Sequence, residues 1–223
     1  MGEWIMPKVS EAYLEEKKTF ILKCTNELLE EMPLFHLSMR DIIKKTGFSQ
    51  GAIYRYYANI DEIFIDLINR IPINYPLEKE VDILLDSKQP ATTILTEVIL
   101  TIGRFVEEVL QTVGGRMFFE LLVYYAYDVE KEQTILSRLI FKQSIDYAQS
   151  KTIDYFIASI EKEEIQLTIP ITSITRFIGV SVDGIIQYAA LSSIKNSQEI
   201  EELVSETADL FQTLTQSIVH FLK

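Results

Sequence analysis

Residues 37–64 read LSMRDIIKKTGFSQGAIYRYYANIDEIF, and this stretch decides the fold. Ser38 and Ser49 each stand directly before a short helix-forming segment, where a serine hydroxyl can cap the helix N-terminus. Gly47 lies between the two segments and tolerates the positive φ that a tight turn requires. The pattern predicts two short helices joined by a turn, the second about eight residues long, which is the layout of a helix-turn-helix.

This segment is locally basic within an acidic chain. The formal net charge is −12 at pH 7, yet residues 38–57 hold four basic residues and one acidic residue. Because attraction to phosphate needs local positive charge, a DNA contact is expected here, and indiscriminate nucleic-acid binding is not. On the second helix, Gln50 offers an amide to adenine and Arg55 a guanidinium to guanine or phosphate.

The same stretch resembles the signature of the tetracycline-repressor (TetR-like) family almost position by position, and the similarity covers roughly residues 15–68. The serine cap, the glycine, the Ser-x-Gly, the Tyr-x-Tyr-Tyr and the Glu-Ile-Phe all fall in register. The resemblance implies base or phosphate contacts by Arg40, base-edge contacts by residues 50–52, and phosphate contacts by two tyrosines. The expected DNA-binding residues are Ser38, Arg40, Ser49, Gln50, Gly51, Ala52, Tyr54, Arg55 and Tyr56.

Two positions depart from the family pattern. Leu34 and Phe35 stand where a Gly-Phe pair usually ends the first helix, and Ile60 stands where a phosphate-binding lysine is common. Without that lysine, non-specific DNA binding is expected to be weaker and less dependent on salt.

The composition indicates an all-α protein. Hydrophobic residues make up 48% of the 223 residues, and 8 glycines and 6 prolines are too few for the many turns of a β fold. Cys24 is the single cysteine and cannot form an internal disulfide, which together with the lack of a secretory signal favours the cytoplasm. The longest stretch without a charged residue is 210–222, shorter than the roughly 20 residues of a membrane-spanning helix, so no membrane is expected.

The chain is expected to form two domains after a disordered arm over residues 1–9. Residues 10–70 hold a three-helix DNA-binding domain with the helix-turn-helix, extended by a helix capped by Asn59, and Pro33 ends the first helix. A linker over residues 71–77 leads to a larger helical ligand-binding and dimerisation domain over residues 71–223. Its helices are predicted over residues 81–85, 91–113, 116–127, 131–161, 171–194 and 199–222, with Gly114 and Gly115 separating the second from the third.

The middle helices of the second domain are rich in aromatic residues, which indicates either an aromatic core or a cavity for a ligand. The expected ligand-binding residues are Phe105, Phe118, Glu120, Tyr124, Tyr125, Phe141, Tyr147 and Phe156. Glu120 either pairs with a cationic ligand or lies on the solvated face of its helix. The two histidines, His36 and His220, are far apart in sequence, so neither a metal site nor a cofactor is expected.

The last two helices are apolar on more than one side, so we expect them to be covered by their own core and by a second copy of the chain. The alternative is a helix buried within one subunit. The expected interface residues are Phe177, Ser181, Gly184, Tyr188, Leu210, Leu214 and Phe221.

These features predict a DNA-binding transcriptional regulator. The first hypothesis is a homodimeric repressor that binds a palindromic operator in double-stranded DNA and is released by an unidentified small apolar or aromatic ligand. A ligand-responsive activator remains the alternative, and an acidic second domain disfavours a nucleoid-packing protein. A helical enzyme is a weaker alternative, because the sequence has no phosphate-binding glycine loop, histidine cluster, Cys/His pair or Gly-x-Ser-x-Gly motif.

Overall fold

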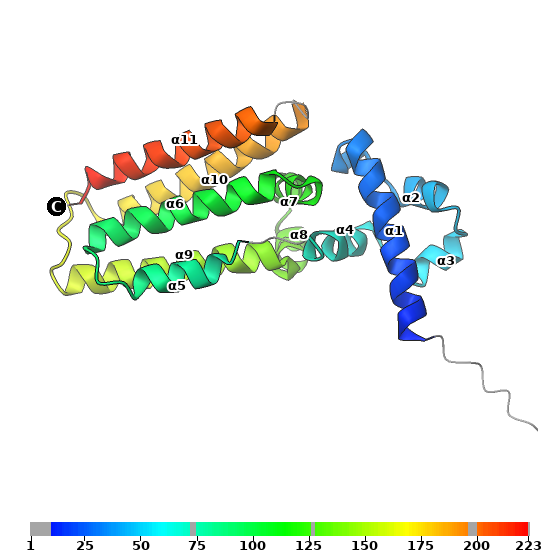
Figure 1. The fold of residues 1–223 in the computed structure, drawn as a ribbon, viewed down its shortest axis with the longest axis horizontal. Helices are drawn as coiled ribbons and strands as arrows, with labels where there is room; N and C mark the ends of the chain where they lie inside the picture. Colours follow the sequence, from blue (N-terminus) through cyan, green and yellow to red (C-terminus); the bar gives the residue numbers. More distant parts are fainter. Residues whose placement is uncertain (1–9, 72–74, 126–127, 196–199, 223) are drawn as a thin grey trace, which may run out of the picture. The chain divides into compact units, whose positions relative to one another are not determined.

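The computed structural model describes residues 10–71, 75–125, 128–195 and 200–222. The named secondary-structure elements of these residues are α-helices and short 3-10 helices (Figure 1). The chain divides into two compact units, Met1–Arg70 and Ile71–Lys223. The predicted N-terminal arm over residues 1–9 lies outside the described residues.

The first unit is built around one long helix. Its elements are α1 (Glu11–Glu31), the 3-10 helix η1 (Leu34–His36), α2 (Met39–Thr46), α3 (Gln50–Tyr54) and α4 (Ile60–Asn69). Helix α1 packs against α2 and α4. Its apolar stripe supplies Ile21 and Leu28 to a core that also buries Ile42, Ile53 and Ile63. The amphipathic spacing of these residues therefore holds the short helices on one long support.

Helix α3 is shorter than the sequence predicts, with five residues in place of about eight. Its last turn tightens, because the backbone N–H of Tyr56 donates to the carbonyl of Ile53 three residues earlier at 2.9 Å. Asn59 then adopts an extended backbone (φ −156°) and caps α4, accepting a hydrogen bond from the N–H of Glu62 at 3.0 Å. The start of the next helix so soon afterwards leaves no room for α3 to continue.

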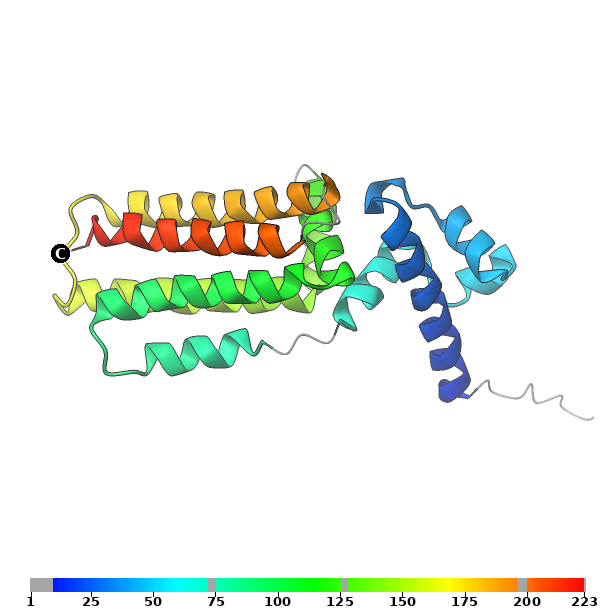
Figure 2. The same cartoon turned by 45° about the horizontal axis from the view of Figure 1, so that its top comes forward.

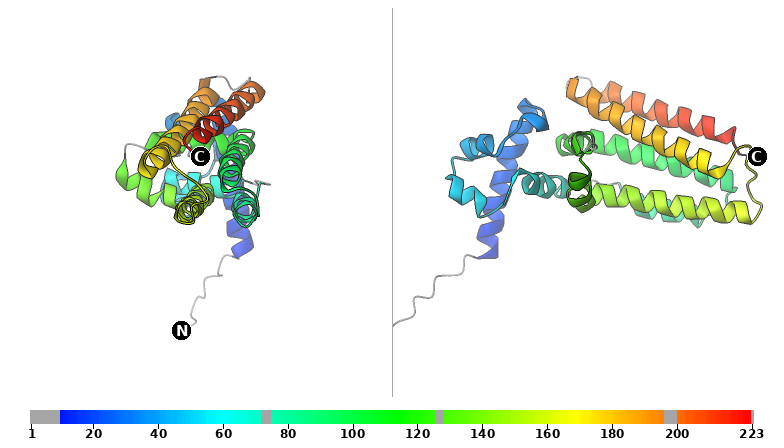
Figure 3. Two further views of the ribbon diagram at one scale, coloured as in Figure 1. Left: turned by 90° about the vertical axis from the view of Figure 1, so that its left-hand side faces the viewer. Right: turned by 180° about the vertical axis from the view of Figure 1, so that it is seen from behind.

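The second unit is a bundle of four long helices with shorter helices around it. Its elements are α5 (Leu77–Leu85), α6 (Ala91–Leu110), α7 (Val113–Tyr125), α8 (Val129–Thr134), the 3-10 helix η2 (Leu136–Arg138), α9 (Ile140–Glu161), α10 (Ile171–Lys195) and α11 (Ile200–Val219). Figures 2 and 3 show α6, α9, α10 and α11 running alongside one another. Helix α6 packs against α5, α9 and α11, and α10 packs against α7 and α11.

The structure corrects two sequence-based boundaries. The helix predicted over residues 131–161 is broken, because Leu139 is extended (ψ 122°) and turns inward with Leu136 to be buried. The double glycine does not separate two helices but lies in the first turn of α7, and the break comes at Gln111. A side chain at Gly115 would lie 1.9 Å from the carbonyl oxygen of Val109, so this glycine permits α7 to begin against the end of α6.

Candidate functional site

Three local features shape the helix-turn-helix. Ser38 and Asp41 form a capping box at the start of α2, with the backbone N–H of Ser38 donating to the Asp41 carboxylate at 3.0 Å. Gly47 ends α2 in the left-handed region (φ 68°) and donates its N–H to the carbonyl of Ile43 at 3.1 Å. Ser49 caps α3 by accepting the N–H of Ala52 at 3.3 Å. The predicted caps and turn are thereby confirmed.

Two glycines near the turn allow a matched test of its backbone. Gly47→Ala is expected to lower the free energy of unfolding by about 1–2 kcal/mol, because an L residue is strained at positive φ. Gly51 lies within α3, and a Cβ there meets nothing within 4 Å, so Gly51→Ala is expected to stabilise the fold by up to about 1 kcal/mol. Urea unfolding of the two variants and the parent protein measures both changes. Equal effects would show that the left-handed turn is unimportant.

The expected DNA-binding residues lie on the accessible side of this motif. Ala52 and Tyr56 are half-buried, and the exposed residues are Ser38, Arg40, Ser49, Gln50, Gly51, Tyr54 and Arg55. The side chains of Arg40, Gln50 and Arg55 have no hydrogen bond or ion pair with any described residue, so they are available to an outside partner. Lys45 instead pairs with Glu27 at 3.1 Å.

Tyr57 and Ile53 are buried, and Tyr57 also takes part in a polar network that the sequence did not indicate. Its hydroxyl donates to Asp66 at 2.6 Å, and Arg70 donates to the same carboxylate at 2.7 Å and also pairs with Glu15. Burial and the bond to Asp66 raise the pKa of Tyr57 far above its usual range. Burial would raise the pKa of Asp66, but the bonds from Arg70 and Tyr57 outweigh it and lower that pKa. The network fastens the end of α4 to α1.

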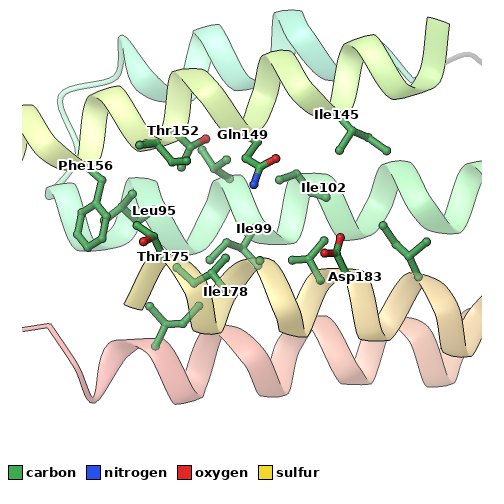
Figure 4. A pocket seen from close by; sticks show the side chains of 16 residues that line it. Leu95, Ile99, Ile102, Ile145, Gln149, Thr152, Phe156, Thr175, Ile178 and Asp183 are labelled. Carbon is green, nitrogen blue, oxygen red and sulfur yellow. The ribbon is translucent and has the colours of Figure 1, made fainter. Parts of the chain in front are cut away.

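The second unit contains a cavity of about 110 Å³ between α6, α9 and α10 (Figure 4). Most of its walls are aliphatic side chains of these three helices, including Ile99, Ile102 and Ile178. Its polar lining side chains are Gln149, Thr152, Thr175 and Asp183. The cavity can therefore bind a small, mainly apolar molecule whose orientation is set by a few polar groups.

Of the eight expected ligand-binding residues, only Phe156 lines this cavity. The rings of Phe105 and Phe118 each pack edge-to-face against the ring of Phe141, and all three side chains are buried. The ring centroids of Phe105 and Phe118 lie 6.0 and 5.3 Å, respectively, from that of Phe141. They form the aromatic core that the sequence left open as the alternative. Tyr147 is engaged elsewhere, because its hydroxyl donates to Asp82 at 2.8 Å.

The remaining three expected ligand-binding residues belong to α7, which contributes no residue to the cavity. Tyr124 is 54% exposed, Tyr125 is buried and Glu120 is half-buried. The signal that could have identified the cavity is the lone acidic residue Asp183, which interrupts an apolar stretch of α10.

The outer face of α10 and α11 carries large exposed apolar side chains. Val180 is 67% exposed, and Phe177, Tyr188, Leu191 and Leu210 are also exposed. Ser181, Gly184, Tyr188 and Leu210 line a shallow groove between the two helices. Among the expected interface residues Leu214 differs, because it is 5% exposed and packs inside its own unit. Phe221 is half-buried, with its ring 5.7 Å from that of Phe177.

No helix in the described part of the chain is long and apolar enough to cross a membrane. Residues 21–67 match the family model described as "Bacterial regulatory proteins, tetR family". The chain is 24% identical over 187 residues to the Bacillus subtilis (strain 168) protein named "Uncharacterized HTH-type transcriptional regulator YfiR", covering 82% of this chain and 84% of that protein.

Solved structures of similar fold include two regulators. A putative TetR-family transcriptional regulator from Syntrophomonas wolfei is 18% identical, with a TM-score of 0.51 over 90% of this chain and 95% of that one. A TetR transcription regulator from Haloarcula marismortui is 20% identical, with a TM-score of 0.50 over 94% of this chain and 100% of that one. Residues 21–67 therefore match the tetR family of bacterial regulatory proteins, and the chain shares its fold with the two solved regulators.

Proposed function

We propose that this protein is a homodimeric repressor that binds a palindromic operator and is released when a small molecule occupies the cavity of its second unit. The observation that carries the proposal is the double role of α10. One side of this helix lines the cavity with Thr175, Ile178 and Val182, and another side exposes apolar residues such as Val180. A molecule in the cavity can therefore act on the surface that we assign to the dimer.

The DNA-binding part of the proposal rests on the accessible, unpaired side chains of the helix-turn-helix. Arg40 and Gln50 have side chains able to read base edges, Arg by its fork to guanine and Gln by its amide to adenine. Tyr54 can donate its exposed hydroxyl to a phosphate, which fixes position without reading sequence. The basic segment within a chain of net charge −12 confines this attraction to one surface.

The dimer part rests on the apolar face of α10 and α11. Contiguous exposed apolar residues at this face indicate an interaction surface, and two such helix pairs related by a two-fold axis bury one another as a four-helix bundle. Gly184 and Ser181 in the groove are small enough to let a partner helix approach closely. A two-fold dimer presents two recognition helices to the two half-sites of a palindrome.

The recognition surface is tested by three substitutions. Arg40→Ala and Gln50→Ala are each expected to cost roughly 1–3 kcal/mol of operator binding and to relax the preference at one operator position. Tyr54→Phe is expected to weaken binding to all sequences alike, because phosphate contacts carry no sequence information. Gel-shift titration with DNA from upstream of the protein's own gene, using wild-type and base-substituted fragments, measures these effects.

Lys88→Ala serves as the control, since Lys88 is an exposed basic residue of the second unit. It is expected to leave operator affinity unchanged. Unchanged affinity in all three helix-turn-helix variants would contradict the assignment of the recognition surface.

A further inference from the structure

The cavity between α6, α9 and α10 contains one charged side chain among the described residues that line it, Asp183. Its carboxylate makes no hydrogen bond or ion pair with any described residue. Lys142 is the basic residue whose charge acts on it, but Lys142 is already paired with Asp146 at 2.5 Å. Asp183 therefore presents to the cavity a carboxylate that has no ion-pair partner among the described residues.

The other polar groups of the cavity mostly offer acceptors. The Thr152 hydroxyl donates to the carbonyl of Ala148 at 2.6 Å, and the Thr175 hydroxyl donates to that of Ile171 at 3.1 Å. With their protons used within their own helices, both oxygens keep only lone pairs for a ligand. Gln149 points into the same space from α9, and its amide can accept or donate (Figure 4).

The apolar surroundings make the charge of Asp183 unfavourable in the empty protein. The side chain stays accessible from solvent, yet loss of hydration raises the pKa of its carboxyl above the usual value. The pKa of this carboxyl is therefore higher in the folded than in the unfolded state. At neutral pH, where the carboxyl is ionised, such a difference lowers the free energy of unfolding. A positively charged group placed beside it would remove this penalty.

We propose that the cavity binds a small organic cation with an apolar body, its positive group beside Asp183 and its body against Ile99, Ile102 and Ile178. This inference rests on the proposed function only for the claim that an effector enters this cavity. A carboxylate or phosphate ligand is disfavoured, because like charges would be brought together in an apolar space. The volume of about 110 Å³ is below that of an apolar cavity of roughly 150 Å³ that takes up benzene in another protein, so it limits the buried body to one ring at most. The positive group would lie outside that volume, beside the solvent-accessible carboxylate of Asp183.

A pair of isosteric probes separates charge from shape. Phenyltrimethylammonium and tert-butylbenzene have the same outline, but only the first carries a charge. With the full-length protein, isothermal titration calorimetry is expected to show at least about tenfold tighter binding of phenyltrimethylammonium, and benzoate is expected not to bind. Asp183→Asn is expected to weaken phenyltrimethylammonium binding about tenfold and to leave tert-butylbenzene within twofold. The expected loss is at the low end for a charged partner, because the carboxylate is accessible to solvent, which screens it.

Two further measurements exclude indirect effects. Asp154→Asn removes the same charge from an exposed position of α9 outside the cavity lining, and it is expected to leave both affinities unchanged. Asp183→Asn is expected to raise the melting temperature of the empty protein, because it removes the unfavourable ionised carboxylate, so lost binding cannot be attributed to lost folding.

Equal affinities for the two isosteres, no binding of phenyltrimethylammonium, or an unchanged affinity in Asp183→Asn would each overturn the cation proposal. Binding of tert-butylbenzene without preference would still leave a ligand cavity. The proposed release from the operator would then be tested separately, by measuring ligand binding with and without operator DNA.

Discussion

Gly184→Leu is expected to convert the protein to a monomer and to lower its operator affinity about a thousandfold. Overpacking a close helix contact typically costs 1–3 kcal/mol, and a two-fold interface places the new side chain in both copies. A monomer reaches only one half-site, so its affinity falls toward that of non-specific binding, which is typically at least about 10³-fold weaker. Sedimentation velocity gives the oligomeric state, and gel-shift titration gives the affinity.

The structure makes this substitution selective for the interface. A Cβ on Gly184 meets nothing within 4 Å in its own chain, so the subunit itself is expected to remain folded. Ser150→Leu adds comparable apolar bulk at an exposed position of α9 and is expected to stay dimeric with unchanged operator affinity. A Gly184→Leu protein that sediments as a dimer would place the interface on another face.

A ligand of the cavity is expected to bind the free protein 5- to 150-fold more tightly than the operator complex. That range corresponds to a coupling free energy of about 1–3 kcal/mol, and linkage requires the ligand to weaken operator binding by the same factor. Titrating the ligand into protein with and without operator DNA, at one salt concentration, measures the ratio. Equal affinities would mean that the cavity is not a switch and that the protein is not an inducible repressor.

The expected coupling has a physical route through α10. A ligand larger than the cavity of about 110 Å³ must move α6, α9 or α10 apart. In the proposed dimer, movement of α10 is expected to shift its apolar face against the partner copy and thereby to change the spacing of the two recognition helices. Half-sites lie about 34 Å apart, so a mismatch of a few ångströms hinders docking at both.

Within the first unit, α4 is expected to transmit such a change to the rest of the DNA-binding motif. Arg70 at its end pairs with Glu15 of α1 and Asp66 of α4, so the two helices are held as one body. We propose that the helix over residues 59–70 and the linker that follows it connect the two units mechanically. The linker is one residue shorter than the sequence predicts, because Leu77 is buried and begins α5. Residues 72–74 of that linker lie outside the described residues.

The features that could be predicted from the sequence are those formed by residues that are close together along the chain. The caps at Ser38, Ser49 and Asn59 need a side chain three residues from its partner, and the turn at Gly47 needs one residue with positive φ. Because these interactions are local, residues 37–64 carry all the information that they require. The same holds for the family resemblance, which depends on that spacing.

The ligand cavity and the helix boundaries near it depended on contacts between distant segments. Helix α9 begins at Ile140 because Leu139 turns into the core, with no glycine or proline to mark the break. Phe118 and Phe141 fill space against each other, whereas Asp183 reaches the cavity, although all three lie on apolar helices. The periodic spacing of apolar residues shows that one face of a helix is shielded from water. It does not show whether that face packs against side chains of the same subunit, lines a cavity or contacts a second chain. Only the packing of α6, α9, α10 and α11 decides that, because each side chain's surroundings are set by helices far from it in sequence.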